Sequence, residues 1–108
     1  MRVVIPVNRP VQLAQLTFDD LSERFARAPF FLVIENGKQH IVRNVERALG
    51  EKGVGKEVVE QLKPEAVIAR AVGEGIKKKL EELGTKIYIV GSEKELEHVL
   101  KELGLKSS

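Results

Sequence analysis

Three short runs of apolar residues constrain the fold of this chain more than any other feature of its sequence. They are residues 3–7 (Val-Val-Ile-Pro-Val), 66–69 (Ala-Val-Ile-Ala) and 87–90 (Ile-Tyr-Ile-Val). None of them alternates with polar residues, and strands of this kind are buried on both faces, as in the centre of an α/β sheet that helices cover. The runs therefore predict a layered α/β domain. Because Pro6 lacks a backbone donor, it predicts a bulge or a strand end in the first run.

A tight turn adds an antiparallel pair to this sheet. Asn36 and Gly37 stand between residues 30–35 and 39–45, which are two further strand-like segments. Both turn residues tolerate a positive φ, which is typical of the type I′ turn in a two-residue hairpin. The sequence therefore predicts five strands, with one antiparallel hairpin in a sheet whose other connections are crossovers.

The segments between the strands have the spacing of helices. Thr17 and Asp20 predict the capped start of a short helix that carries Leu21 and Phe25 on one face and ends before Pro29. Three longer helices follow the hairpin, with apolar positions at Val58, Val59 and Leu62; at Ile76, Leu80 and Leu83; and at Leu96, Val99, Leu100 and Leu103. The element order is therefore β-α-β-β-α-β-α-β-α, and right-handed crossovers place helices on both faces of a five-stranded mixed sheet.

Local signals mark the ends of these helices. Gly84 and Gly104 are expected just beyond the second and third of the longer helices, where a left-handed residue commonly ends a helix. Ser92 and Glu95 predict a capping box at the start of the last one.

Length and composition exclude several classes of protein. A chain of 108 residues forms one domain, which we expect to span residues 1–104, with 105–108 as a frayed tail. The absence of cysteine excludes disulfides, zinc fingers, a thiolate nucleophile and clusters ligated by the chain's own sulfur. The net charge of +2 does not indicate a nucleic-acid binder, and no apolar run is long enough to cross a membrane. With no visible signal peptide we expect a cytoplasmic protein, and the abundance of Lys and Glu is associated with thermophilic sources.

Two glycine-rich segments precede predicted helices. Residues 50–57 match the first part of a phosphate-binding P-loop, but Glu57 stands where a Mg²⁺-binding Ser or Thr is needed. Gly53 and Gly55 still leave backbone amides bare at a helix N-terminus, which suits an anion. Gly73 and Gly75 lack the third glycine of a dinucleotide fingerprint, although they allow a ligand to approach the backbone. The alternative for both segments is a plain turn before a helix.

The sequence offers little for catalysis or metal binding. A nuclease of the ribonuclease H type holds two metal ions with carboxylates at neighbouring strand ends, whereas Asp19 and Asp20 are adjacent in a predicted helix. His40 and His98 are the only histidines, and no spacing pairs them, so we expect both on the surface. No catalytic residue and no metal site is predicted, and a metal-dependent nuclease or phosphotransferase is the least favoured function.

Arginines gather where ligands bind in an α/β sheet, beyond the carboxyl ends of the parallel strands. Asn8 follows the first strand and Arg70 follows the fourth, while Arg24 and Arg27 lie in the segment after the first strand. Guanidinium groups and free amides that converge on one edge are typical of an anion site. The alternative is that these arginines are solvated and pair with Glu23, Glu46 and Glu74.

Two motifs carry a family resemblance. Residues 4–8 read Val-Ile-Pro-Val-Asn, and residues 22–31 read Ser-Glu-Arg-Phe-Ala-Arg-Ala-Pro-Phe-Phe. They resemble the I-P-V-D/N and S-E-H-F-G-R-A-P-x-F motifs of the dinitrogenase iron–molybdenum cofactor biosynthesis family, the NifX-like nitrogenase accessory proteins. The loop at 53–55, the run at 66–69 and residues 83–88 are similar to later family segments, so that the resemblance covers residues 3–103.

This resemblance implies a three-layer α/β/α fold with a ribonuclease H-like motif, in which the strand order is 3-2-1-4-5 and the second strand is antiparallel. It also implies a non-enzymatic protein that carries iron–sulfur or iron–molybdenum cofactors, or their precursors, and exchanges them with cofactor-assembly proteins.

The chain departs from the family pattern where that pattern has histidine. Arg24 replaces the histidine of the second motif, Ala26 replaces a glycine, and Arg70 replaces the glycine after the fourth strand; the histidine near the glycine loop is also absent. We therefore expect an arginine-lined site for an anionic ligand in place of direct metal ligands. Its predicted residues are Asn8, Arg24, Arg27, Gly53, Gly55, Arg70 and Gly73. The alternative function is a protein-interaction or regulatory module that kept the fold and lost the cofactor.

Overall fold

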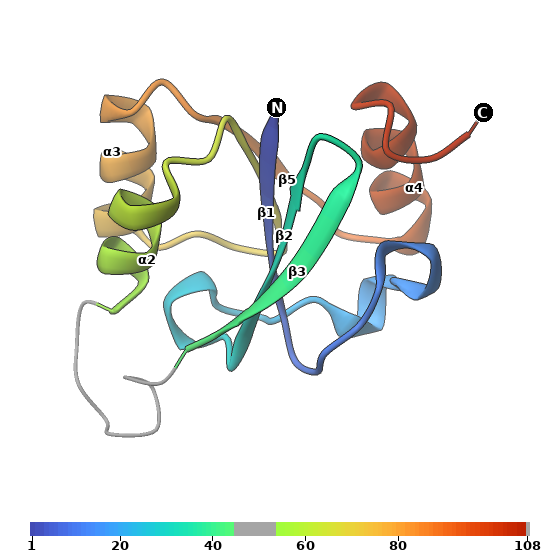
Figure 1. The fold of residues 1–108 in the computed structure, drawn as a ribbon. Coiled ribbons are helices and arrows are strands. Elements are labelled where there is room, and N and C mark those ends of the chain that lie inside the picture. Colours follow the sequence, from blue (N-terminus) through green and yellow to red (C-terminus); the bar gives the residue numbers. More distant parts are fainter. Residues whose placement is uncertain (45–53, 108) are drawn as a thin grey trace.

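The computed structural model of the protein describes residues 1–44 and 54–107. Its strands are β1 (Arg2–Val7), β2 (Phe30–Glu35), β3 (Lys38–Arg43), β4 (Ala66–Ala69) and β5 (Lys86–Ile89). They form one five-stranded sheet in the order β3-β2-β1-β4-β5, which confirms the predicted topology (Figure 1). β2 is antiparallel to β1 and β3, whereas β4 is parallel to both β1 and β5.

Helices cover both faces of the sheet. α2 (Val54–Leu62) and α3 (Glu74–Glu82) lie on one face, and α4 (Glu93–Glu102) lies on the other (Figure 1). β1 is central, with Val3 and Ile5 in the core beneath α4 and Val4 in the core beneath α2 and α3. The apolar runs are therefore continuous because both of their faces are covered. Among the helices of residues 1–44 and 54–107, none has the length and apolar character needed to span a bilayer.

The predicted turn and caps are present, with one change. Asn36 and Gly37 have φ values of 51° and 79°, as a type I′ turn requires. Ser92 caps α4, because its hydroxyl accepts a hydrogen bond of 3.1 Å from the Glu95 amide. The Glu95 carboxylate, however, accepts from the amide of Gly91 at 2.8 Å, one residue before the cap, so the reciprocal bond of the predicted capping box is displaced.

The connection between β1 and β2 is not the predicted helix. It contains three 3₁₀ turns, η1 (Leu13–Gln15), η2 (Phe18–Asp20) and η3 (Phe25–Arg27). The reason is tertiary: Leu21 belongs to the core under α4, whereas Phe25 belongs to the core under α2 and α3. One helix face cannot supply both sides of a sheet, so the chain passes below the sheet edge in extended backbone between short turns.

The ends of several elements also differ from prediction. β1 continues through Pro6 to Val7 without a bulge, because the described pairing of β1 with β4 involves only Val3 and Val4 and makes no demand on Pro6. β3 starts at Lys38, one residue before the predicted start, and ends at Arg43, so that Asn44 is not part of the strand; residue 45 lies outside the described residues. β5 is shifted one residue toward the N-terminus.

The beginning of the predicted frayed tail contacts α4. Leu105 packs against the core beneath that helix, and Lys106 pairs with Glu97 at 2.5 Å.

Candidate functional site

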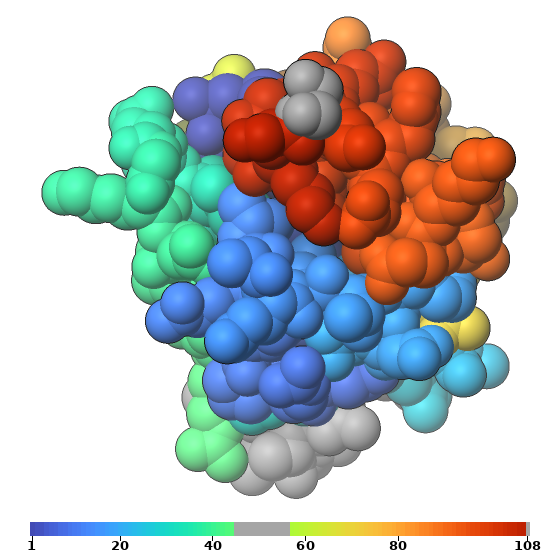
Figure 2. All heavy atoms as spheres, turned by 90° about the vertical axis from the view of Figure 1, so that its right-hand side faces the viewer, coloured from blue at the N-terminus to red at the C-terminus, as the bar shows by residue number. Residues whose placement is uncertain are grey.

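The residues that follow β1 lie at the carboxyl edge of the parallel strands and are held there by a buried carboxylate. Asp20 accepts hydrogen bonds from the Thr17 amide at 2.9 Å and from Arg9 Nε at 2.7 Å. Burial by itself raises the pKa of Asp20, but the bonds from Arg9 and Thr17 outweigh it and hold the pKa below its usual value. Asp20 is therefore a structural anion that closes the loop. In Figure 2 these residues, in blue, fill the surface below α4.

Asn8 belongs to the same structural network. Its backbone amide donates to the Asp20 carbonyl at 2.8 Å, and its side-chain amide donates to the Leu21 carbonyl at 3.3 Å. The side-chain nitrogen that sequence reasoning reserved for a ligand thus holds the β1 end against the loop.

Arg24 and Arg27 are brought together with the start of α3. Arg24 precedes the turn η3 and Arg27 is its last residue; Phe25 in this turn is buried, and its ring packs against that of Phe31 with a centroid distance of 5.2 Å. A hollow of about 400 Å³ opens beside this turn, which we call the arginine hollow. It is lined by Arg24, Phe25, Ala26, Arg27, Ala71, Val72, Gly73 and Ile76. The buried ring anchors the turn, so both guanidinium groups start from a fixed backbone.

Gly73 contributes backbone to this hollow. It is the N-cap of α3, with φ of −68° and ψ of 159°, and its carbonyl accepts the first helical bond from Lys77 at 2.8 Å. The amides of the first helical turn have no partner within a helix, and they carry the positive end of the helix dipole. Nothing within 4 Å would meet a side chain at Gly73, so the space in front of it is open.

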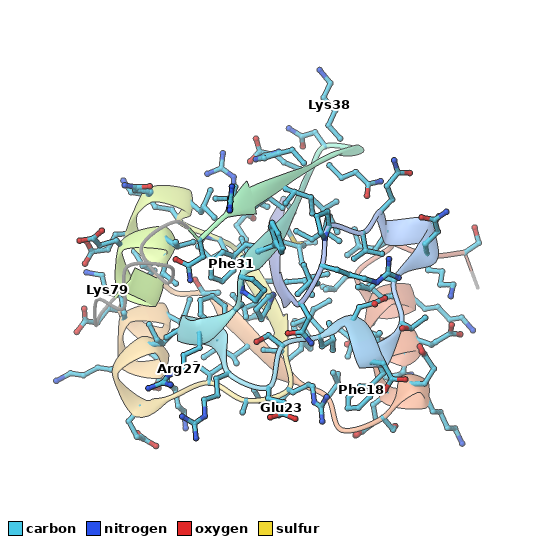
Figure 3. The ribbon with its side chains drawn as sticks, turned by 90° about the horizontal axis from the view of Figure 1, so that it is seen from below. Phe18, Glu23, Arg27, Phe31, Lys38 and Lys79 are labelled. Carbon is cyan, nitrogen blue, oxygen red and sulfur yellow. The ribbon has the colours of Figure 1, made fainter. Side chains whose placement is uncertain are left out.

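Arg70 lies next to this hollow but not in it. Its guanidinium carbon stands 4.6 Å from the centre of the Phe18 ring, a cation–π contact between the end of β4 and the turn η2. It lines a second hollow of about 500 Å³, which shares Ala71 and Val72 with the arginine hollow. Figure 3 looks onto this edge, with Arg27 near α3, Phe18 near α4, and Glu23 between them in the view. The sequence analysis did not identify Phe18 as the partner of Arg70, because no local pattern links two residues so far apart in the chain.

The two predicted loop glycines are not both part of the described structure. Gly53 lies outside the described residues. Gly55 lies in the first turn of α2, not in a loop before the helix.

The predicted alternative, in which the arginines pair with glutamates, is not seen among the described residues. The ion pairs within that part of the chain are Arg2–Glu35, Arg9–Asp20, Lys79–Glu60, Lys79–Glu82 and Lys106–Glu97. None of them involves Arg24, Arg27 or Arg70, and Glu46 lies outside the described residues.

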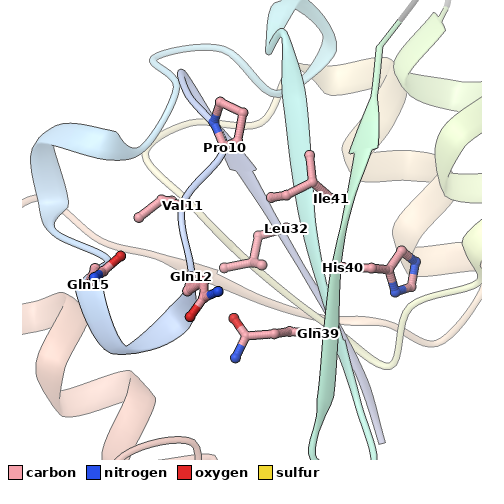
Figure 4. Close-up of a pocket in the computed structure, with 8 residues that line it drawn as sticks. All are labelled: Pro10, Val11, Gln12, Gln15, Leu32, Gln39, His40 and Ile41. Atoms are coloured by element: carbon pink, nitrogen blue, oxygen red, sulfur yellow. The ribbon is translucent and has the colours of Figure 1, made fainter.

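Neither histidine lines the arginine hollow. His98 is exposed on α4, and His40 is exposed on β3. Figure 4 shows a third hollow, of about 440 Å³, where Gln12, Gln15 and Gln39 gather over Leu32 while the His40 ring points away. No sequence motif predicted this polar cleft. Within the described ranges, no three His, Cys, Asp or Glu side chains are grouped so that they could hold a metal ion.

Comparisons with known proteins give one matching family model and several solved structures that share the fold. The family model described as dinitrogenase iron–molybdenum cofactor matches residues 11–105. A Thermotoga protein, described as a candidate NifB protein of the DUF35 family, is 28% identical with a TM-score of 0.63; the match covers 94% of this chain and 87% of that one. A comparison with curated proteins finds no match.

Two further solved structures share the fold at lower identity. The apo form of the orange protein from Desulfovibrio gigas is 19% identical, with a TM-score of 0.67 and coverage of 96% of this chain and 88% of that one. A candidate dinitrogenase from Methanocaldococcus jannaschii is also 19% identical, with a TM-score of 0.59 and coverage of 97% and 90%.

Proposed function

This chain belongs to the dinitrogenase iron–molybdenum cofactor family, and from that premise we propose that it is a non-enzymatic carrier of an anionic cofactor or cofactor precursor. The cargo is a metal–sulfur cluster or an organic acid attached to one. We propose further that it passes to and from a cofactor-assembly protein in the cytoplasm.

The observation that carries this proposal is the arginine hollow. Arg24, Arg27 and the N-terminus of α3 surround this hollow of about 400 Å³. No described carboxylate forms an ion pair with either arginine. A guanidinium donates several hydrogen bonds in one plane. This geometry suits the oxygen atoms of a carboxylate or phosphate and the sulfur atoms of a sulfide. Arg70 stands one hollow away and adds positive charge to the same edge.

The hydrogen-bond donors of the arginine hollow fit a cargo that is bound through its non-metal atoms. The chain has no cysteine, and neither His40 nor His98 lines the arginine hollow. Metal–sulfur clusters are held directly by thiolate or imidazole in most proteins. Here the arginines are suited to bind the sulfides or a carboxylate arm of a cluster whose metals keep their own ligands.

A catalytic role has little support from the acidic residues at this edge. Asp20 is engaged with Arg9 and Thr17, and its neighbour Asp19 is exposed. Two-metal hydrolysis needs carboxylates that are free to converge on ions. We therefore propose binding without catalysis.

Two measurements test the carrier proposal. Protein purified without oxygen is analysed for iron and molybdenum and for a charge-transfer absorption band, which a carried cluster produces. Thermal unfolding is then followed with added sulfate or citrate for the wild type and for Arg24→Ala, Arg27→Ala and Arg43→Ala. Arg43 is an exposed arginine on β3 and serves as the matched control.

We expect each anion to stabilise the wild type and the control, less so at high salt because the attraction is largely electrostatic. Loss of Arg24 or Arg27 should weaken anion binding by about 1–3 kcal/mol, the usual value of a hydrogen bond to a charged group. Equal stabilisation of all four proteins would overturn the arginine hollow as the site.

The second candidate is an interaction module that kept the fold and lost the cofactor. It is favoured by the missing thiols and by the absence of both histidines from the lining of the arginine hollow. Metal-free protein, together with anion binding that does not depend on Arg24 or Arg27, would support this candidate over the carrier.

A further inference from the structure

We propose that two copies of this chain associate through the free edge of β5, with their residues Ile87, Tyr88 and Ile89 paired antiparallel across a two-fold axis. The inference concerns the free edge of β5, which does not line the arginine hollow, and its test is independent of the carrier proposal. It starts from Ile89, whose exposed fraction of 54% exceeds those of Met1 (48%) and Leu83 (37%), the other exposed large hydrophobic residues among the described ones.

The backbone of β5 has unused donors and acceptors at this edge. Among the described strands, β5 is terminal and pairs only with β4. The amides of Lys86 and Val90 donate to Glu65 and Ala69 on the β4 side, at 3.0 Å each. Because successive residues of a strand point their N–H and C=O groups to opposite sides, the groups of Ile87 and Ile89 point outward.

This alternation selects one register for a second copy. When Tyr88 lies opposite its own symmetry mate, each Ile87 faces the Ile89 of the other copy. Both residues have outward backbone groups, so the two Ile87–Ile89 pairs form the hydrogen-bonded pairs of an antiparallel ladder, with four hydrogen bonds in all. The segment Ile-Tyr-Ile reads the same in both directions, so the strand is its own complement.

The side chains agree with the backbone. Ile87 and Ile89 lie on the α3 face and both line the second hollow, beside Arg70, Glu74 and Lys77. Antiparallel partners share a face, so the register gathers four isoleucines over this hollow in the two copies. On the α4 face, Ile89 also borders a hollow of about 420 Å³ with Lys94, Glu95 and His98.

Charge does not oppose the contact. The rim on the α3 face carries Glu74 as well as Arg70 and Lys77, and the rim on the α4 face carries Glu95 as well as Lys94. Two copies related by a two-fold axis therefore meet with acid and base on both rims, so opposite charges are available to pair between copies.

The other edge of the sheet shows what a protected edge looks like in this chain. β3 has exposed Lys38, His40 and Arg43 along its length, and charged or polar side chains of this kind discourage strand addition. In β5, no charged side chain follows Lys86. The contrast points to the β5 edge as the one that accepts a second strand.

The size of the contact sets its strength. A pair of four-residue strands with their helical flanks covers less than the roughly 1,200 Å² of a standard interface, so a weak dimer is expected. We expect a dissociation constant in the micromolar to millimolar range for a weak dimer of this kind. Sedimentation of the full chain over about 10 µM to 1 mM should therefore show a shift from monomer to dimer.

Ile89→Lys tests the surface, with His40→Lys as the matched control that adds the same charge to the opposite edge strand. Ile89→Lys should weaken dimerisation by at least about tenfold, whereas His40→Lys should leave it unchanged. A wild type that stays monomeric throughout the range, or equal effects of the two variants, would overturn the proposal.

Tyr88→Cys tests the register, because a chain without cysteine can form a disulfide only with a second copy of the variant. Cα atoms of a non-hydrogen-bonded antiparallel pair lie about 4.5 Å apart, within disulfide range. Under mild oxidation Tyr88→Cys should cross-link faster than Ile89→Cys, whose thiols are offset along the strands, and faster than His40→Cys. Faster cross-linking of either comparison variant would overturn the register. Far-UV circular dichroism checks that each variant is folded.

Discussion

The connection between β1 and β2 and the segment from α2 onward both cover the sheet, but they differ in secondary structure and in how they place their buried side chains. Residues 8–29 use three 3₁₀ turns, and their buried apolar side chains are divided between the two cores: Val11, Leu16 and Leu21 under α4, and Phe25 and Ala28 under α2 and α3. The segment from residue 54 uses three helices whose apolar stripes, such as Leu96, Val99 and Leu100, face the strands. The first connection therefore anchors itself in both cores, whereas each helix of the second directs one apolar stripe into a single core.

This difference bears on the candidate site, because each connection supplies half of it. Arg24 and Arg27 come from the irregular connection, and Gly73 with its helical amides comes from the regular one. Removing an anchor of residues 8–29 should affect both stability and anion binding. Removing a helix signal elsewhere should affect stability alone.

Phe25→Ala should have the largest effect. Phe25 is 1% exposed and packs against Phe31 at a ring distance of 5.2 Å. Loss of such a side chain leaves a cavity and costs about 3–5 kcal/mol. Denaturant unfolding measures the loss, and sulfate titration should show weaker binding because Arg24 and Arg27 flank the missing ring. Leu96→Ala on α4 is the control, with about 2–5 kcal/mol lost and anion binding kept. Weakened binding in the control would contradict the division between the two connections.

Asp20→Asn should cost about 1–3 kcal/mol at neutral pH, since it removes the charge that accepts bonds from Arg9 and Thr17. The pKa of Asp20 is lowered in the fold, so its contribution to stability is present above the ordinary Asp value of about 3.9. That contribution is lost as the pH falls through the lowered folded value. The wild type should therefore lose more unfolding free energy between neutral and strongly acidic pH than the variant does; parallel curves would show that Asp20 carries no such linkage.

Ser92→Ala should cost about 1 kcal/mol, because the hydroxyl caps the Glu95 amide at the start of α4. Anion binding should not change, since α4 does not line the arginine hollow. Thermal unfolding with and without sulfate measures both quantities. An altered sulfate response would show that the two halves of the molecule are coupled.

Arg70→Ala should have the smallest effect on stability, about 0.5–1 kcal/mol, the range for a cation–π contact near the surface. Arg70→Lys is the companion variant, because a lysine keeps the charge and can also stand over the Phe18 ring. Retained stability in Arg70→Lys is expected, and hydrogen exchange of the turn η2 should rise only in Arg70→Ala. Unchanged exchange in both variants would mean that the contact with Phe18 does not hold that turn.

Much of the architecture could be predicted because it depends on short-range patterns. The apolar runs at 3–7 and 66–69, the Asn36–Gly37 turn and the apolar spacing of α3 and α4 each specify one element with little help from the rest. The strand order followed from the crossover rule and the family resemblance, and it was confirmed.

What failed was the part where neighbouring residues serve different cores. Leu21 and Phe25 have the spacing of one helical turn, yet they are buried on opposite faces of the sheet. A periodic pattern records only that both are apolar, and it cannot record which face each one enters. The same is true of the site: Arg24, Arg27 and Arg70 could be assigned to one edge from chain order alone.

Only the tertiary structure decided how that edge is divided. It placed Arg24 and Arg27 with Gly73, turned Arg70 onto Phe18, and used Asn8 to hold the loop. The physical reason is range. Turns, caps and strand burial depend on contacts within a few residues, and so the amino-acid sequence by itself determined them. The partner of a side chain some 50 residues away depends on how the packed layers bring the ends of the strands together.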